Sequence, residues 1–133
     1  MAKKKSTRRF PTRSKYGNKK VVYKDITFDS KKEMEHYIKL EEKLKKGEIC
    51  NLRRQVTFVL IPTIYEEYVK HLKTKDKIMT RRKQAQATYV ADFVYEDAEG
   101  KEYVVDTKGF KTKEYNLKKK MMYYLLGIDI IEV

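Results

Sequence analysis

The chain has few cysteines and histidines, the residues that cross-link a small fold through disulfides or a bound metal. Its 133 residues include one cysteine, two histidines, two prolines and no tryptophan. Cys50 alone cannot form an internal disulfide, and with only His36 and His71 beside it the chain lacks the ligands of a structural zinc site. We therefore expect packing to hold the fold together and any bound metal to have oxygen ligands.

Long apolar runs are also missing. No stretch approaches the ~20 apolar residues that span a bilayer, and the basic start MAKKKSTRRF is not followed by the apolar segment of a secretory signal. These absences predict a soluble cytoplasmic protein without a membrane partner. The length fits one domain, and an apolar content of 41% is sufficient for a core.

Acidic residues are absent from the first 24 positions, which hold ten Lys or Arg, while the remainder holds 22 basic and 19 acidic residues. We expect residues 1–15 to form a disordered basic arm and residues 16–133 a single domain. A basic arm on a nearly balanced body favours a polyanion partner, because neutralising phosphates releases counterions. Nucleic acid is the leading candidate, and a solubilising tail with no specific role is the alternative.

The hydrophobic pattern predicts a mixed α/β domain. After a short hairpin at residues 19–28, the order helix, three strands, helix, strand predicts a mixed sheet flanked by helices. The predicted helices span residues 30–46 and about 112–126, and the predicted strands span residues 52–61, 87–95, 103–108 and 128–133. Residues 62–85 show no clean period and are predicted to be irregular or partly helical.

Glu33 is an acidic residue that is predicted to point inward. Winding residues 30–46 at about 100° per residue puts Glu33 on the apolar face and Glu35 opposite it. That face is formed by Met34, Tyr37, Ile38, Leu40 and Leu44. The sequence Ser30-Lys31-Lys32-Glu33 also matches a capping box, in which Glu33 would only cap the helix. The pattern leaves both roles open.

Two further acids are predicted to face each other. In the second predicted hairpin, a three-residue loop that ends in Gly100 sets Asp92 directly opposite Asp106. Carboxylates about 5 Å apart repel each other, and a shared cation or a proton removes that cost. The period of a strand puts Lys108 on the same face as Asp106. A local ion pair on a solvated strand is the simpler alternative for Lys108.

The second predicted helix carries basic residues beside an apolar arc. Lys118 falls inside the arc of residues 115–126, whereas Lys119 and Lys120 lie outside it. Lys118 either extends its charged end to solvent or reaches a phosphate. The predicted nucleic-acid contacts are Lys111, Lys113, Lys118, Arg81 and Arg82.

Three stretches, FDSKKEMEHY, YVADFVY and VVDTKGFKTKEYNLKKK, resemble the motifs of the PD-(D/E)XK nuclease superfamily. They place Glu33 on the first helix, Asp92 on the middle strand and Asp106-Thr107-Lys108 on the next strand. The element order is similar to the restriction-endonuclease-like core of that superfamily. Within it, the stretches look like a family of small phage and prophage proteins catalogued as a domain of unknown function. Ala91 stands where the superfamily has its name-giving proline, which does not bind metal.

The resemblance implies a metal-dependent endonuclease, in which oxygen ligands hold one or two Mg²⁺ ions and Mn²⁺ is expected to substitute. Lys108 would orient or help to deprotonate the attacking water and balance developing charge. Gln55 resembles a glutamine found on the first long strand in some relatives. The implied metal ligands are Asp92, Asp106, the carbonyl of Thr107 and Glu33, the last directly or through water. The implied catalytic residues are Glu33, Asp92, Asp106 and Lys108.

We therefore expect hydrolysis of phosphodiester bonds in DNA, in phage recombination or replication and in the host cytoplasm. Branched DNA such as a Holliday junction is the first candidate, since a two-fold substrate suits a homodimer; a nicking or flap nuclease also fits. The main alternative is a non-catalytic nucleic-acid-binding phage protein, and a phage protein that redirects a host enzyme is the third. The opposed Asp92 and Asp106 argue against the non-catalytic binding protein, because such a pair has little use in a protein that binds only phosphate; the sequence leaves the third class open.

Overall fold

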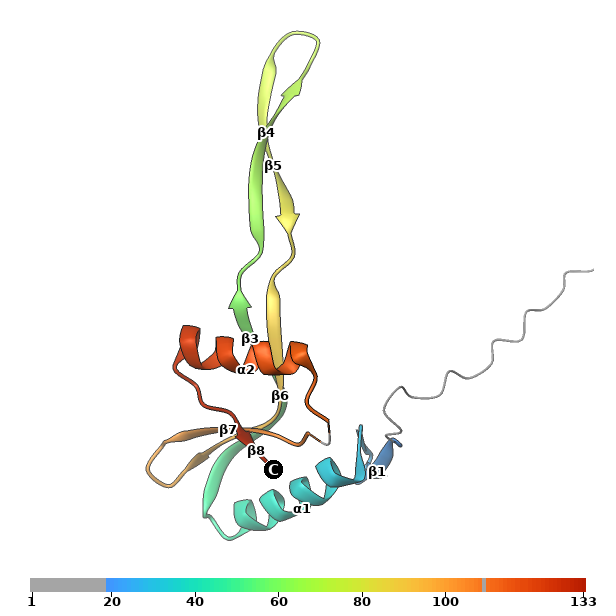
Figure 1. Cartoon of the computed structure of the whole chain (residues 1–133), viewed down its shortest axis with the longest axis vertical. Coiled ribbons are helices and arrows are strands. Elements are labelled where there is room, and N and C mark those ends of the chain that lie inside the picture. The colour runs from blue at the N-terminus through green and yellow to red at the C-terminus, as the bar shows by residue number, and fades with distance from the viewer. Residues whose placement is uncertain (1–18, 109) are drawn as a thin grey trace, which may run out of the picture.

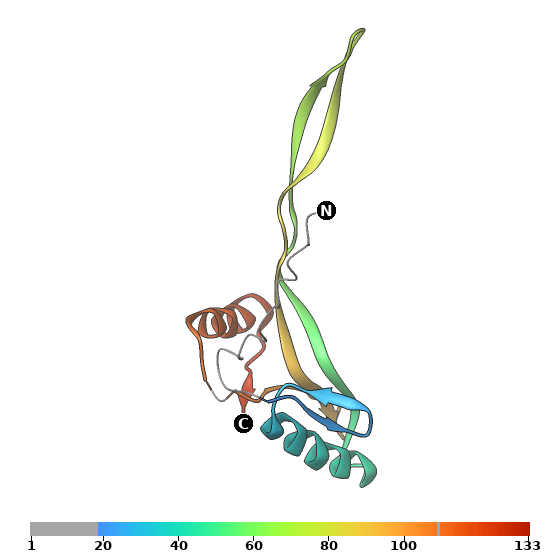
Figure 2. The ribbon, with the colours of Figure 1, turned by 90° about the vertical axis from the view of Figure 1, so that its right-hand side faces the viewer.

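Two helices cover opposite faces of a four-stranded sheet, from which a long hairpin projects (Figures 1 and 2). The computed structural model describes residues 19–108 and 110–133. The predicted mixed α/β class is confirmed, whereas the predicted arm at residues 1–15 lies outside the described residues. Among the described residues, no helix is long and apolar enough to cross a membrane.

Two short strands precede the first helix, five strands lie between the two helices, and one short strand follows the second helix. In chain order they are β1 (Val21–Tyr23), β2 (Ile26–Phe28), α1 (Lys31–Lys45), β3 (Ile49–Ile61), β4 (Ile64–His71), β5 (Asp76–Gln84), β6 (Ala87–Asp97), β7 (Glu102–Asp106), α2 (Lys113–Leu126) and β8 (Ile131–Glu132). The central sheet has the order β3-β6-β7-β8. Its neighbours are antiparallel except for β7 and β8, which are parallel because α2 returns the chain across the sheet.

The first hairpin and α1 form where the local sequence predicts them. Lys24 and Asp25 have φ values of 46° and 63°, so both central residues of the β1–β2 turn are left-handed, as in a type I′ turn. The Ser30 hydroxyl accepts the backbone N–H of Glu33 at 3.1 Å and so caps α1. Gly47, with φ of 74°, follows the end of this helix and allows the chain to reverse.

Each face of the sheet has its own apolar cluster. The cluster beneath α1 combines Leu40 with buried residues of β2, β3, β6 and β7. The cluster beneath α2 combines Tyr115 and Met122 with buried residues of β3, β6 and β7. Burial of these side chains is the main term that stabilises the three layers.

The apolar arc predicted for α2 is only partly buried. Tyr115 and Met122 are buried, but four other members of the arc are exposed: Leu117, Tyr124, Leu125 and Leu126. A small sheet covers only one narrow stripe of a helix, so the remaining apolar residues face solvent.

The hairpin of β6 and β7 has the predicted register. The backbone N–H of Asp97 donates to the carbonyl of Lys101 at 3.0 Å, and Gly100 has φ of 84°. Phe93 pairs with Val105. One further step along the same register sets Asp92 opposite Asp106.

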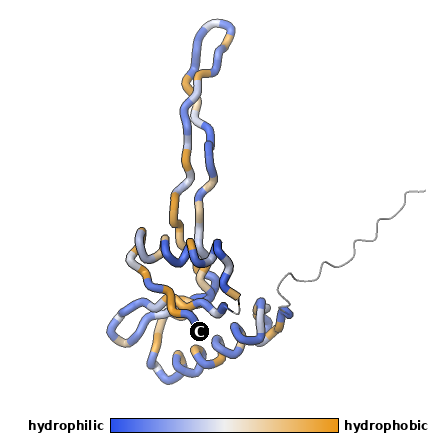
Figure 3. The backbone as a smooth tube through the Cα atoms, viewed as in Figure 1, coloured by the Kyte–Doolittle hydropathy of each residue, from blue (hydrophilic) through white to orange (hydrophobic). Residues whose placement is uncertain are grey.

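Residues 62–85 form a β-hairpin, so the prediction of an irregular or partly helical segment is wrong. Pro62 ends β3, because it has no N–H for the sheet, and β4 and β5 then pair with each other over eight positions. The segment lacks a clean period because both faces of this hairpin are exposed to solvent, and no buried face selects apolar residues. Figure 3 shows hydrophobic positions scattered along both strands.

Candidate active site

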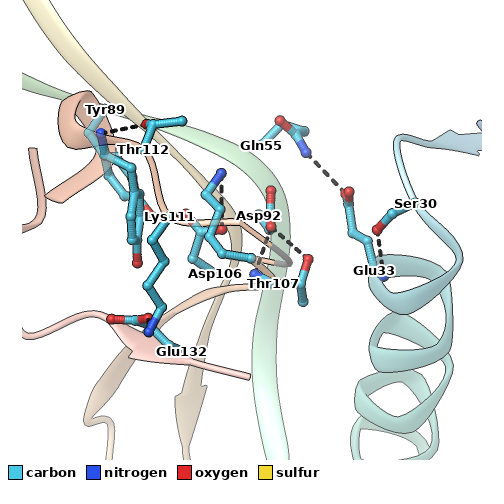
Figure 4. Close-up of polar contacts among 12 residues, drawn as sticks. Ser30, Glu33, Gln55, Tyr89, Asp92, Asp106, Thr107, Lys111, Thr112 and Glu132 are labelled. Carbon is cyan, nitrogen blue, oxygen red and sulfur yellow. Dashed lines mark hydrogen bonds and ion pairs between the residues drawn. The ribbon is translucent and has the colours of Figure 1, made fainter. Parts of the chain in front are cut away.

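Asp92 and Asp106 lie side by side on β6 and β7, with different partners (Figure 4). The Asp92 carboxylate accepts the backbone N–H and the hydroxyl of Thr107, both at 2.8 Å to Oδ2. Asp106 Oδ2 accepts the hydroxyl of Tyr89. Asp106 is fully buried; its Oδ1 receives no hydrogen bond and lies 3.4 Å from Lys108 Nζ. One oxygen of the pair is therefore buried and receives no hydrogen bond, and the Lys108 ammonium is its charged neighbour.

A bend in β3 and β6 shapes this part of the sheet. The register of the two strands sets Gln55, whose φ is 51°, opposite Asp92. Ala91 and Val94 belong to the same apolar cluster beneath α2. Strict alternation would put two side chains three residues apart on opposite faces of the sheet. The alternation of side chains between the two faces therefore shifts by one residue at Asp92. Because of this shift, Tyr89 lies on the face of the sheet beneath α2, where its hydroxyl reaches Asp106.

Glu33 reaches the same region from α1. Its side chain is buried, and its Oε1 accepts Gln55 Nε2 at 3.2 Å and lies 3.7 Å from an Arg54 guanidinium nitrogen. The Arg54 guanidinium also lies 4.3 Å from the centroid of the Phe28 ring. Ser30 caps the helix through the backbone of Glu33. The Glu33 carboxylate faces β3, so the inward orientation predicted from the helical period is confirmed.

The carboxylates are in an environment that disfavours their charged forms. Burial, followed by repulsion from Asp92 and Asp29, raises the pKa of Glu33 from 4.5 to about 7. Burial is also the main cause that raises the pKa of Asp106 from 3.8 to about 6; the Tyr89 hydrogen bond opposes it and Asp92 adds to it. A bound cation would relieve both effects, because it stabilises the ionised carboxylates.

Lys108 lies next to this acidic cluster, and Lys118 lines the same cavity as Lys108. Lys108 Nζ is 5.3 Å from the centroid of the Tyr115 ring, and Lys118 Nζ is 3.1 Å from Glu114 Oε1. Both lysines line an open cavity of about 270 Å³ between β6 and the start of α2. A phosphate that entered this cavity would meet both lysines, and the Glu114 carboxylate is also part of the lining.

The other predicted nucleic-acid contacts lie apart from the carboxylates. Lys111 forms an ion pair with Glu132 of β8, and Lys113 is exposed in the first turn of α2. Arg81 and Arg82 are exposed on β5, within the projecting hairpin (Figure 1). The structure thus places Lys118 on the cavity that Lys108 lines, but not the two arginines.

Sequence reasoning missed Tyr89 and Arg54. Strand alternation separates Tyr89 from Asp92, so only the bend explains why Tyr89 donates to Asp106. A signal for Arg54 was present, since Arg53-Arg54-Gln55 interrupts a strand that is otherwise largely apolar. A polar triplet in the middle of a long strand indicates charged partners that approach from a neighbouring element.

The donor set fits a hard divalent cation held largely by water. Among the described residues, no group of three or more His, Cys, Asp or Glu side chains is arranged to hold a metal ion. Mg²⁺ does not require three protein ligands, since it commonly binds one or two carboxylates and keeps several waters. Asp92 and Asp106 supply two adjacent carboxylates, and Asp106 Oδ1, which receives no hydrogen bond, is an oxygen of the required type.

Comparison with known proteins identifies a family. No match to this chain was found among curated proteins or among solved structures. One family model matches residues 13–127, which is most of the chain. The chain therefore belongs to the family described as "Protein of unknown function (DUF1064)".

Proposed function

We propose that the protein is a Mg²⁺-dependent endonuclease that hydrolyses phosphodiester bonds in DNA. The observation that carries the proposal is the opposed pair Asp92 and Asp106, with a buried carboxylate oxygen that receives no hydrogen bond and lies 3.4 Å from Lys108 Nζ. Such a cluster costs free energy in the metal-free protein. A metal-binding role for the pair accounts for that cost.

The order of elements supports a restriction-endonuclease-like core. The body contains α1, three strands (β3, β6 and β7), α2 and β8 in that order, as in the PD-(D/E)XK superfamily that the sequence resembles. In this interpretation the β4–β5 hairpin is an insertion between the first and second core strands. Glu33, Asp92 and Asp106-Thr107-Lys108 then lie on the elements that carry the motifs of that superfamily.

Each residue of the cluster has a role in this proposal. Asp92 and Asp106, with the carbonyl of Thr107, would hold Mg²⁺, and Glu33 would bind it directly or through water. The ion would supply a hydroxide at neutral pH and stabilise charge on the phosphate. Tyr89 holds Asp106 through one oxygen and leaves the other available. The cavity lined by Lys108 and Lys118 would take the phosphate, in competition with the Glu114 carboxylate that pairs with Lys118.

Lys108 has the position of a group that acts on the attacking water. Its ammonium lies against Asp106 and over the ring of Tyr115, and its side chain is one-third exposed, so it faces both the carboxylate and solvent. A cation at this point orients a water molecule and stabilises negative charge as it develops on the phosphate.

A non-catalytic DNA-binding protein is less well supported by the same geometry. Buried Glu33 and Asp106 have raised pKa values and repel phosphate whenever they are ionised. A protein that only binds phosphate gains nothing from this arrangement. Tyr89 would then hydrogen-bond a carboxylate that weakens binding.

The experiment that tests the proposal compares linear, nicked and four-way DNA with and without Mg²⁺. We expect the wild type to cleave at least one of these substrates in Mg²⁺ and none in EDTA, with the four-way junction as first choice because its symmetry suits a homodimer. Asp92→Asn and Asp106→Asn should abolish cleavage and leave binding in EDTA nearly intact. Asp129→Asn is the matched control, because Asp129 is an exposed acid in the loop before β8. Equal cleavage by all three variants would refute the assignment of the metal site.

A further inference from the structure

The β4–β5 hairpin is a ribbon that contributes to neither apolar cluster. No residue of Ile64–His71 or Asp76–Gln84 belongs to the two clusters of the body, and most side chains on both strands are exposed. The ribbon projects from the end of β3 and β6, away from α1 (Figures 1 and 2). A two-stranded hairpin is marginally stable alone in water, so burial does not account for this element.

The ribbon is strongly basic, and the charge increases toward its tip. Residues 64–84 contain seven Lys or Arg and three Asp or Glu. Lys70 and Lys77 are directly opposite each other, and Lys73 and Lys75 lie in the connecting loop. Across residues 19–108 and 110–133, no ion pair joins any of these four lysines to an acid. Like charges directly opposite on a hairpin destabilise it, unless an anion lies between them.

The other face of the tip carries an aliphatic pair next to the ion pair of His71 and Asp76. Val69 and Ile78 are paired one step from Lys70 and Lys77, so they project to the opposite side of the ribbon. Their side chains are 53% and 70% exposed, respectively. The tip therefore presents lysines on one face and, on the other, an aliphatic pair beside His71 and Asp76. Lysine side chains are long enough to reach phosphates on the walls of a groove while the aliphatic pair faces the base edges on its floor.

We propose that this ribbon inserts into the major groove of B-form DNA beside the cleaved phosphate. That groove, about 12 Å wide, admits a two-stranded β-ribbon, whereas the corresponding groove of A-form RNA is too narrow and deep. The tip lysines contact phosphates, and Val69 and Ile78 contact base edges such as thymine methyl groups. The inference deepens the proposed function: it rests on a DNA substrate, but not on cleavage.

The length of the ribbon sets the extent of DNA that it can reach. Eight residues at about 3.3 Å each extend about 26 Å, which corresponds to about 8 base pairs at 3.4 Å per pair. The substrate class is therefore DNA with at least this much duplex on one side of the scissile phosphate. Fully single-stranded DNA and very short duplexes do not engage the ribbon.

Binding in EDTA tests the inference without requiring catalysis. The double variant Lys70→Gln/Lys77→Gln is compared with Lys43→Gln/Lys46→Gln, which removes the same charge from exposed positions at the end of α1. On duplex DNA of about 30 base pairs, the log-log salt slope should become shallower by about 1.8 for the ribbon variant, from ~0.9 per phosphate contact, and should not change for the control. The wild type should prefer this duplex to one of about 10 base pairs and to an RNA duplex, and the ribbon variant should lose both preferences.

Equal slopes for the two double variants would overturn the inference, as would an equal loss on DNA and RNA duplexes. If the ribbon substitutions left DNA binding unchanged and altered only the oligomeric mass measured by sedimentation, the ribbon would contact a second copy of the chain. That result would also overturn the inference. The proposed function fails separately. If the ribbon variant has the expected binding defect but the wild type never cleaves, the ribbon binds DNA and the nuclease assignment is wrong.

Discussion

Replacing Asp106 by asparagine should stabilise the metal-free protein at neutral pH. Asp106 is buried, and burial together with the charge of Asp92 raises its pKa from 3.8 to about 6. An acid whose pKa is raised on folding contributes stability that is fully present below its unfolded pKa and is lost as the pH rises through its folded pKa. For Asp106 the loss extends from about pH 4 to somewhat above pH 6. Asparagine carries no charge, so the variant does not lose stability over this pH range.

The size of the effect follows from the shift in pKa. A change from 3.8 to about 6 corresponds to about 3 kcal/mol at 1.36 kcal/mol per unit. The substitution also removes the contact of Asp106 with Lys108, a partly exposed ion pair worth up to ~1 kcal/mol. An asparagine oxygen can still accept the Tyr89 hydroxyl. We therefore expect the free energy of unfolding at neutral pH in EDTA to rise by about 1 to 3 kcal/mol, well beyond the usual effect of a point mutation in this direction.

Urea unfolding followed by circular dichroism at a series of pH values measures this difference. The gap between Asp106→Asn and the wild type should be largest near neutral pH and vanish near pH 4. Millimolar Mg²⁺ should stabilise the wild type and not the variant, because only the wild type keeps both carboxylates that would bind the ion. Asp97→Asn is the matched control in the same hairpin. Backbone hydrogen bonds from Lys101 and Glu99, with the Tyr103 hydroxyl, lower the pKa of Asp97, so its replacement should destabilise the protein.

A lower stability of Asp106→Asn than of wild type near neutral pH in EDTA, with the Asp97 control behaving as expected, would refute the reasoning. It would mean that the metal-free site is satisfied by its hydrogen bonds and ion pair. The repulsion between Asp92 and Asp106 could then not serve as evidence for a cation.

Two further predictions concern the proposed chemistry. Lys108→Ala should lower kcat strongly with little change in DNA affinity, because its charge is needed where negative charge develops; weaker binding at unchanged kcat would make it a phosphate contact instead. Glu33→Gln should lose activity while keeping the fold, whereas Glu35→Gln, on the exposed side of α1, should have nearly wild-type rates. Steady-state kinetics on the preferred substrate measure both, and similar losses for Glu33 and Glu35 would contradict the role assigned to the buried carboxylate.

Local chemistry determined much of the body in advance. The Ser30 cap, the Lys24-Asp25 turn and the loop ending in Gly100 are short-range features, because hydrogen bonds and left-handed residues within a few positions decide them. A register fixed by such a loop extends along both strands, so it set Asp92 opposite Asp106 from sequence alone. The period of α1 likewise buried Glu33, because one apolar stripe can face only one way.

Features that depend on contacts between residues far apart in the chain could not be predicted from the sequence. The bend at Gln55 and Asp92 arises where β3 and β6 pair, and it alone brings Tyr89 to Asp106. The exposure of Leu117 and Tyr124 depends on how much of α2 the narrow sheet covers.

The ribbon is the clearest case of a feature that only the tertiary structure decided. Neither face of β4 and β5 is buried, so the hydrophobic effect imposes no alternation on residues 64–84 and leaves no period in the sequence. The basic charge of this segment was evident from the sequence. Its arrangement was not, because the pairing of Lys70 with Lys77 and of Val69 with Ile78 exists only once the two strands have met.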